Sequence, residues 1–375
     1  MLATLTVPRD AFNAPAAADR RYSALLARAL VETAPSTCTV VGFYSSTVSA
    51  DEAAAEASDL GMQRHVRSRR SRRTLSALWA AGIAGGAPRG MWHSASLFAP
   101  LHTHRHDHGE QVVVTMHNTL AWDRPAADRA GAAQQRLLFA RAERHADAIV
   151  VPSHALAERI SGFGQLGDRI RVIPGAPTVQ PGFDGADDDG DVAALPSDFI
   201  VVSADTTHPE QLTEVLRGIS LPGTPDIAIV VVGQPPANAG AVEELAAAAG
   251  LSAGRVQHVA HSGSVELTAI LGRASAVVAP RIDDMSGTDV LNAFAMGTPV
   301  VCVDTPAYRE LAGDTDHAMF VEPGDGFAEG VSASIIRVLE HADVASRFAL
   351  AGADRAAAYT WSETARQVWR LHAEI

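Results

Sequence analysis

Lysine is absent from this sequence, and all 30 basic residues are arginines. With 43 acidic residues, the formal net charge is −13. This charge argues against nucleic acid as a partner, because nucleic-acid-binding proteins present clustered positive charge to the phosphate backbone. The absence of lysine also excludes chemistry that needs a lysine amine, such as anchoring pyridoxal phosphate as a Schiff base.

Long apolar runs and cysteines are also scarce. No stretch reaches the ~18 consecutive apolar residues of a membrane-spanning helix, and the start, MLATLTVPRDAFNAP, lacks the features of a signal peptide. We therefore expect a cytoplasmic protein. Cys38 and Cys302 each lie in a valine-rich run and are expected to be buried, reduced thiols. No CxxC or HExxH motif is present to indicate a metal site.

Short runs of Val and Ile alternate with Ala-rich segments of helical periodicity. The candidate strands are Thr39–Tyr44, Gln111–Met116, Ala148–Val151, Arg171–Ile173, Phe199–Ser203, Ala228–Val232, Val256–Val259, Ala276–Val278, Val300–Val303 and Ala318–Val321. These runs are almost wholly apolar, which is typical of strands buried on both faces of a parallel sheet. Strands that alternate with helices indicate βαβ units, so the expected fold class is α/β with doubly wound sheets.

A segment rich in Pro, Gly and Asp separates the two halves of the chain. It covers residues 174–198, has no periodicity and is expected to be a linker. A length of 375 residues is sufficient for two domains. We expect Rossmann-like domains at residues 1–190 and 198–359. Such sheets bind ligands at the carboxyl ends of their strands, so a cleft between the domains is the expected binding site.

Five segments of the second half occur in the order found in glycosyltransferase family 4. They are IAIVVVGQPP (227–236), VQHVAHSGSVELTAILGRASAVVAP (256–280), NAFAMGTPVVCVDTPAYRELAGD (292–314), FVEPGD (320–325) and AAAYTWSETARQVWRL (356–371). The first half matches more loosely, through VVVTMHNTLAW (112–122), HADAIVVPSHALAERI (145–160) and RVIPGAP (171–177). The sequence thus resembles retaining, nucleotide-sugar-dependent enzymes of the GT-B fold. The resemblance implies two Rossmann-like domains facing across a cleft, with residues 360–375 packing back on the first domain.

The resemblance implies a donor site built around two glutamates of an E-x7-E motif. Asp284 stands at the first position and Asn292 at the second, so both can accept hydrogen bonds but only Asp284 carries charge. Between them, Ser286, Gly287 and Thr288 form a turn whose amides are expected to face the sugar. The alternative is that this stretch is only an acidic loop entering a helix.

The remaining site residues follow from the same alignment. His117 ends a strand and is the second candidate catalytic residue beside Asp284; Ser153 either binds the donor or caps a helix. The family's basic pair is missing from residues 203–212, which leaves the diphosphate without a cation there. Donor contacts are therefore assigned to Ser203, His208 and Arg281. Arg21 and Tyr22 are expected on the acceptor side, in place of the family's glycine-rich turn.

Two further stretches suggest contacts outside this site. RHVRSRRSRR and the apolar residues up to position 80 could touch an anionic membrane surface through residues 64–80, or form a solvated face. LHTHRHDHGE, at 101–110, has histidines at 102, 104, 106 and 108, flanked by Pro100 and Gly109, and is expected to be a loop without a metal.

The resemblance implies a hexosyltransferase. It would move mannose or glucose from a nucleotide diphosphate sugar to a polysaccharide or glycolipid acceptor, with retained configuration, no cofactor and no metal, in the cytoplasm or at the inner face of the membrane. The alternative is a degenerate GT-B paralogue that binds a partner glycosyltransferase or a glycan without transfer. A third alternative is a GT-B enzyme of another chemistry, such as a sugar epimerase. A phosphorylase is nearly excluded, because its pyridoxal phosphate needs a lysine.

Overall fold

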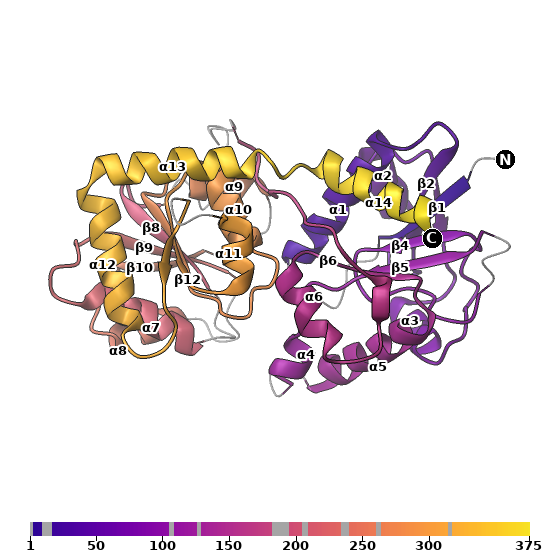
Figure 1. Ribbon diagram of the computed structural model, residues 1–375, viewed down its shortest axis with the longest axis horizontal. Helices are drawn as coiled ribbons and strands as arrows, with labels where there is room; N and C mark the ends of the chain where they lie inside the picture. Colours follow the sequence, from indigo (N-terminus) through magenta and orange to yellow (C-terminus); the bar gives the residue numbers. More distant parts are fainter. Residues whose placement is uncertain are drawn as a thin grey trace. The chain divides into compact units, whose positions relative to one another are not determined.

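The computed structural model describes residues 3–9, 17–104, 109–125, 129–181, 195–204, 209–233, 240–259, 264–313 and 317–375. The chain forms two compact units, each built on one parallel sheet with helices around it (Figure 1). Unit 1 comprises Met1–Gly175 and Thr360–Ile375, and unit 2 comprises Ala176–Tyr359. The chain first passes from unit 1 to unit 2 after Gly175, within the Pro-, Gly- and Asp-rich segment 174–198. The predicted α/β fold class is confirmed.

Unit 1 contains a sheet whose described strands run in the order β3-β2-β1-β4-β5-β6-β7. Their bounds are β1 Ala3–Pro8, β2 Cys38–Tyr44, β3 Arg64–Arg67, β4 Met91–Ser94, β5 Gln111–Thr115, β6 Ala148–Val151 and β7 Ile170–Val172. All neighbouring pairs are parallel, as in the register Leu5 with Val40. The sequence order reverses between β1 and β4, which makes this the topological switch point of the sheet.

Helices flank this sheet, and one of them comes from the far end of the chain. They are α1 Ala17–Glu32, α2 Ala50–Asp59, α3 Arg72–Ala80, α4 Leu120–Asp123, α5 Arg129–His145, α6 His154–Ser161, the 3-10 turn η2 Gly167–Arg169, and α14 Trp361–Glu374. The Thr360 side chain caps α14 by accepting from the Glu363 amide. Ala365, Val368 and Leu371 of α14 lie in one buried core with Leu26 and Leu30 of α1, so residues 360–375 complete the core of unit 1.

Unit 2 repeats the architecture with the strand order β10-β9-β8-β11-β12-β13. Its strands are β8 Phe199–Ser203, β9 Ala228–Val232, β10 Val256–Val259, β11 Ala276–Ala279, β12 Val300–Val303 and β13 Met319–Val321. Its helices are α7 Pro209–Ser220, α8 Ala241–Ala248, α9 Ser264–Arg273, α10 Thr288–Ala295, α11 Pro306–Ala312, α12 Phe327–Glu340 and α13 Ala342–Ala356. Here the switch point lies between β8 and β11.

The two cysteines lie in strands β2 and β12, and both are free thiols. Cys302 is buried, and burial raises the pKa of its thiol. Cys38 is half-buried, so the expectation of full burial was wrong for this residue, which begins its strand. No helix in the described ranges has the length and apolarity needed to span a bilayer.

Candidate functional site

The switch point of unit 2 brings together the ends of two adjacent strands and the start of a helix. Ser203 is the last residue of β8, Arg281 follows β11, and α10 begins at Thr288. The Ser203 hydroxyl donates to Asp289 Oδ2 at 2.6 Å, which ties the end of β8 to the first turn of α10. Ligands of doubly wound sheets bind at this edge, so the candidate donor residues of unit 2 lie where the fold favours a ligand.

Asp284 is the centre of the turn that leads into α10. It is 7% exposed. Its Oδ1 accepts from the Ser286 amide at 2.9 Å, the Ser286 hydroxyl at 2.8 Å and the Gly287 amide at 3.1 Å. In this structure the Ser286 and Gly287 amides, which were expected to face a sugar, thus donate to a carboxylate of the same turn. A side chain as short as aspartate folds back onto its own turn.

The other oxygen of Asp284 has a partner from a different helix. Tyr308 of α11 is fully buried, and its hydroxyl donates to Asp284 Oδ2 at 3.3 Å. Burial and the nearby carboxylates of Asp284 and Asp289 raise the pKa of Tyr308 well above its ordinary value, so the phenol stays protonated. Both oxygens of Asp284 are thus hydrogen-bonded within unit 2.

Arg281 is a cation surrounded by carboxylates. Its Nε lies 3.6 Å from Asp283 Oδ1, and its side chain is 26% exposed. Burial disfavours the charged guanidinium, but Asp284 and Asp289, with smaller contributions from Tyr308 and Asp283, outweigh burial and raise the pKa of Arg281. Arg281 therefore stays charged, and the aspartates around it carry more negative charge than it balances.

Gly287 is required by the backbone of the turn. It precedes α10 with φ +63°, a left-handed conformation that glycine adopts without strain. A Cβ at this position would also lie 3.0 Å from Leu311 Cδ2. The Thr288 amide donates to the Ser286 hydroxyl at 3.3 Å, which completes the start of the helix.

Asn292 is 2% exposed and is bonded to the segment that follows the crossing between the units. Its Oδ1 accepts from the Thr178 amide at 2.7 Å, and its Nδ2 donates to Thr178 Oγ1 at 3.1 Å. Two residues further on, the Gln180 amide donates to Thr268 Oγ1 at 3.1 Å. The carboxamide expected to bind a donor therefore bonds Thr178 within unit 2, and Thr268 bonds Gln180 of the same segment.

The candidate residues of unit 1 also lie near its switch point. His117 follows β5, and its Nε2 donates to the carbonyl of Ala95, just beyond β4, at 2.9 Å. The Tyr22 ring of α1 meets the imidazole edge to face, with ring centroids 4.5 Å apart. Burial raises the pKa of Tyr22, so its phenol stays protonated. The structure thus brings Tyr22 and His117 together, and half-buried Arg21 directly precedes Tyr22 in the sequence.

Two other predicted donor residues have different outcomes. Ser153 caps α6, since its hydroxyl accepts from the Leu156 amide at 3.1 Å. This is the capping role that the sequence left open beside donor binding. His208 lies outside the described residues.

The stretch 64–80 forms β3 and α3 rather than one continuous basic face. Trp79 is fully buried against Phe43, Trp92 and Phe98, so it is not available to a membrane. The exposed Arg67 donates from Nε to the Val48 carbonyl at 2.6 Å. Contact between the exposed arginines of this stretch and an anionic membrane stays a prediction.

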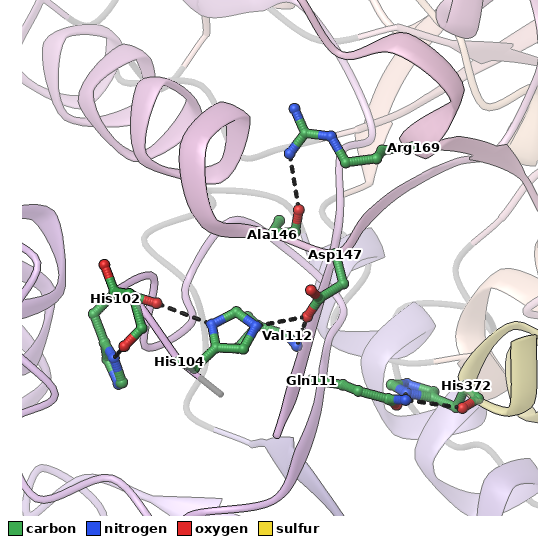
Figure 2. A network of polar contacts seen from close by, with 9 residues as sticks. His102, His104, Gln111, Val112, Ala146, Asp147, Arg169 and His372 are labelled. Atoms are coloured by element: carbon green, nitrogen blue, oxygen red, sulfur yellow. Dashed lines mark hydrogen bonds and ion pairs between the residues drawn. The ribbon is translucent and has the colours of Figure 1, made fainter. Parts of the chain in front are cut away.

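The histidine-rich stretch contributes an ion pair to the structure (Figure 2). His104 Nδ1 donates to the His102 carbonyl at 2.9 Å, and Nε2 lies 2.9 Å from Asp147 Oδ2. The hydrogen bond to Asp147 raises the pKa of His104. Within the part of the chain that is described, no three His, Cys, Asp or Glu side chains are placed to hold a metal ion.

Sequence reasoning missed several residues of these sites. Tyr308 and Asp289 contact the predicted Asp284 and Ser203, and Trp361 contacts Tyr22, but none of the three was assigned to a site from the sequence. Trp361 lies in the segment 356–371 of the family resemblance, where it was expected only to begin the last helix. One signal was available: Tyr308 and Asp289 lie within or beside the segment 292–314 that carries the family resemblance. Thr178 had none, because it lies in the segment that was treated as a linker.

Two family profiles match the chain and together cover most of it. Residues 21–176 match the one described as Glycosyltransferase Family 4, and residues 204–341 match the one described as Glycosyl transferases group 1. With two units of Rossmann-like topology, these matches define the class as GT-B glycosyltransferases. Within that class the chain is a family 4-like protein.

Curated relatives match a smaller part of the chain. A phosphatidyl-myo-inositol mannosyltransferase of Mycobacterium leprae is 30% identical over 154 residues, which are 40% of this chain and 38% of the relative. The corresponding protein of Mycolicibacterium smegmatis is 28% identical over 152 residues, again 40% and 38%. The matched region thus spans less than two thirds of these relatives.

Solved structures share the fold over nearly the whole chain. Sucrose-phosphate synthase from Thermosynechococcus elongatus superimposes with a TM-score of 0.72 at 18% identity, covering 99% of this chain and 98% of that one. Anabaena HepE, solved in complex with UDP-glucose, gives 0.70 at 13% identity and covers 99% and 100%. At these identities the likeness shows the fold alone.

Proposed function

We propose that this protein transfers a hexose, mannose or glucose, from a nucleotide diphosphate sugar to a hydroxyl of a polysaccharide or glycolipid. The observation that carries the proposal is the switch point of unit 2, where Ser203, Arg281 and the Asp284–Thr288 turn meet. The family 4-like matches on both units and the mannosyltransferase relatives support the same class of reaction.

The proposed reaction retains the configuration of the transferred sugar. The developing positive charge on the sugar is stabilised by the departing phosphate, which also accepts the proton of the acceptor hydroxyl on the same face. Arg281 is the proposed cation for the diphosphate, and its charge is secured by its carboxylate neighbours. Asp284 is the proposed acceptor for sugar hydroxyls, and His117 is the second proposed catalytic residue. Arg21 and Tyr22 are proposed to line the acceptor side.

Binding tests this proposal before any acceptor is known. A thermal-shift screen with UDP, GDP, ADP and their glucose and mannose derivatives should raise the midpoint for at least one ligand, because a ligand that binds only the folded state stabilises it. Arg281→Ala should weaken binding of that diphosphate by about tenfold or more, since a charge-assisted contact is lost. Calorimetric titration measures the change, and unchanged affinity would remove Arg281 from the site.

Arg217→Ala is the matched control for that variant. Arg217 lies on α7 of the same unit and makes an exposed ion pair with Glu214, 2.9 Å away. It changes the charge of unit 2 equally, away from the switch point. Retained configuration would be read from the anomeric proton of the product by NMR, and an inverted product would overturn the proposed course of the reaction.

A second candidate function is a GT-B scaffold that binds a glycan or a partner glycosyltransferase without transfer. It is favoured by the internal hydrogen bonds of Asp284 and Asn292, since both side chains are already bonded within unit 2. A flat thermal response to all the nucleotides above would support this function over the first.

Peripheral contact with an anionic membrane is a separate part of the proposal. It rests on exposed arginines such as Arg64, Arg69 and Arg73. Co-sedimentation with phosphatidylserine vesicles, compared with phosphatidylcholine vesicles, tests it; equal recovery with both would remove the membrane from the proposal.

A further inference from the structure

Four segments that are distant in sequence meet at the Tyr22 ring in unit 1. Tyr22 comes from α1, His117 follows β5, Gly175 follows β7, and Trp361 begins α14. Tyr22 contacts His117 at a centroid distance of 4.5 Å and Trp361 at 5.2 Å, with ring planes at 76° and 74°. Edge-to-face pairs of this kind are attractive and orient the rings that form them.

The His117 ring is fixed in two ways. Its Nε2 donates to the Ala95 carbonyl, so the neutral ring keeps Nδ1 as its acceptor nitrogen. The contact with Tyr22 restrains the rotation of the imidazole about that hydrogen bond. The orientation of Nδ1 therefore depends on where the Tyr22 ring lies.

The position of Tyr22 depends in turn on Gly175 and Trp361. A Cβ on Gly175 would lie 3.2 Å from Tyr22 Cε2, so the glycine leaves room for the ring. Trp361 is held at the start of α14, where Thr364, on the next turn, donates from Oγ1 to the Pro174 carbonyl at 2.9 Å. This hydrogen bond fixes the start of α14 beside the residue that precedes Gly175.

We propose that Trp361 is a positioning residue that acts through Tyr22 to orient the His117 imidazole. The proposal rests on the catalytic role of His117 in the proposed function. Removing the indole takes away a ring contact on the side of Tyr22 that faces α14, and the His117 ring then loses its single orientation. The last helix of unit 1 thereby contributes to the site without contacting substrate.

Three variants test this role. Trp361→Ala should move or broaden the His117 Cε1–H resonance, which is assigned by its loss in His117→Gln. It should slow hydrolysis or transfer of UDP-glucose or GDP-mannose by about tenfold, with the donor KM changed less than about twofold, because a misoriented group costs rate rather than ground-state binding. Trp361→Phe keeps an aromatic edge and should restore most of both signals.

Trp369→Phe is the matched control on the same helix. Trp369 is 8% exposed and donates from Nε1 to the Leu30 carbonyl at 3.3 Å, so its replacement removes a hydrogen bond that holds α14 against α1 while Trp361 stays in place. It should lower the unfolding temperature and leave the His117 resonance in place. If Trp369→Phe and Trp361→Ala change that resonance alike, or Trp361→Ala leaves it unchanged, the positioning role is wrong. The NMR result decides this even if the wild type turns over no nucleotide sugar, an outcome that would overturn the proposed function instead.

Discussion

His93 Nδ1 lies 3.3 Å from His372 Nε2, between strand β4 and helix α14 of unit 1. His93 is fully buried and His372 is 5% exposed. The Gln111 amide nitrogen donates to the His372 carbonyl, so Gln111 Oε1 accepts from His372 Nδ1 at 2.9 Å (Figure 2). His372 Nε2 then has no proton and accepts from His93 Nδ1. Among the described residues, His93 Nε2 has no hydrogen-bond partner.

This arrangement suits two neutral rings and makes unit 1 sensitive to acid. Burial lowers the pKa of His372 to about 4, although Asp147 partly opposes the shift. Burial and His372 lower the pKa of His93 as well. An unfolded histidine titrates near pH 6.5. Below pH ~6.5 the unfolded chain binds protons that the buried rings do not. The stability of unit 1 is therefore fully present above pH ~6.5 and is lost as the pH falls towards 4.

The free energy of unfolding, measured with urea, should fall between pH 7 and pH 4, and His372 alone should account for about 3 kcal/mol of that fall. Tryptophan fluorescence reports unit 1 alone, because all five tryptophans of the chain lie in it. His372→Gln should reduce the loss, whereas the control His65→Gln, at an exposed position of unit 1, should not. Equal losses in wild type and His372→Gln would contradict this prediction.

The His104–Asp147 pair should have the opposite pH dependence. The pKa of His104 is raised, chiefly by its hydrogen bond to Asp147, so the stabilisation is fully present below pH ~6.5 and is lost as the pH rises through the folded-state pKa. Asp147→Asn keeps an acceptor for the Val112 amide but removes the charge. It should cost about 2 kcal/mol at pH 6 and less at pH 9 in the same unfolding experiment; a cost independent of pH would show that the ion pair contributes nothing.

Asn292 should matter for stability more than for donor binding. Asn292→Ala leaves the Thr178 amide without its acceptor in a buried position, at a cost of about 1–3 kcal/mol. Asn292→Asp keeps that acceptor and should cost less. Thermal unfolding compares the two variants, and calorimetry with UDP tests binding. A stable Asn292→Ala protein with weakened nucleotide affinity would instead assign Asn292 to the donor.

Gly218 allows helices α7 and α12 to approach closely. A Cβ on Gly218 would lie 2.4 Å from the Ala328 carbonyl oxygen, a backbone atom that cannot rotate away. Gly218→Ala should therefore destabilise unit 2 by about 1–3 kcal/mol. Gly272→Ala is the control, because its Cβ would meet only the flexible Met296 Cε at 3.1 Å. Circular dichroism on heating should show a lower midpoint for Gly218→Ala only.

The sheet strands were predictable where apolar side chains fill both faces. The runs Phe199–Ser203 and Val300–Val303 coincide with β8 and β12. The strands that were not predicted have other compositions. β1, Ala3–Pro8, was missed because Thr4 and Thr6 interrupt its apolar residues. β3 is an edge strand, Arg64–Arg67, with mostly exposed side chains. Strand β4, Met91–Ser94, buries His93 and Ser94, whose polarity hides the pattern.

The candidate site was predictable in position but less so in its contacts. The family resemblance led to Asp284 and His117, and both lie at carboxyl ends of strands near a switch point. It did not predict that Asp284 would accept from its own turn, or that Asn292 would bind Thr178. The first contact depends on the short side chain of Asp284, and the second on Thr178, which is distant in sequence. A local motif contains neither kind of information.

Because α14 belongs to unit 1, the two units differ in when they can fold during synthesis. Unit 2 is one uninterrupted stretch, whereas unit 1 needs a helix translated after all of unit 2. Until that helix emerges, the apolar surface around Leu26 and Leu30 lacks its covering residues. In the nascent chain, unit 2 can therefore fold while unit 1 is still incomplete. During that time, chaperones could bind the exposed apolar surface of unit 1.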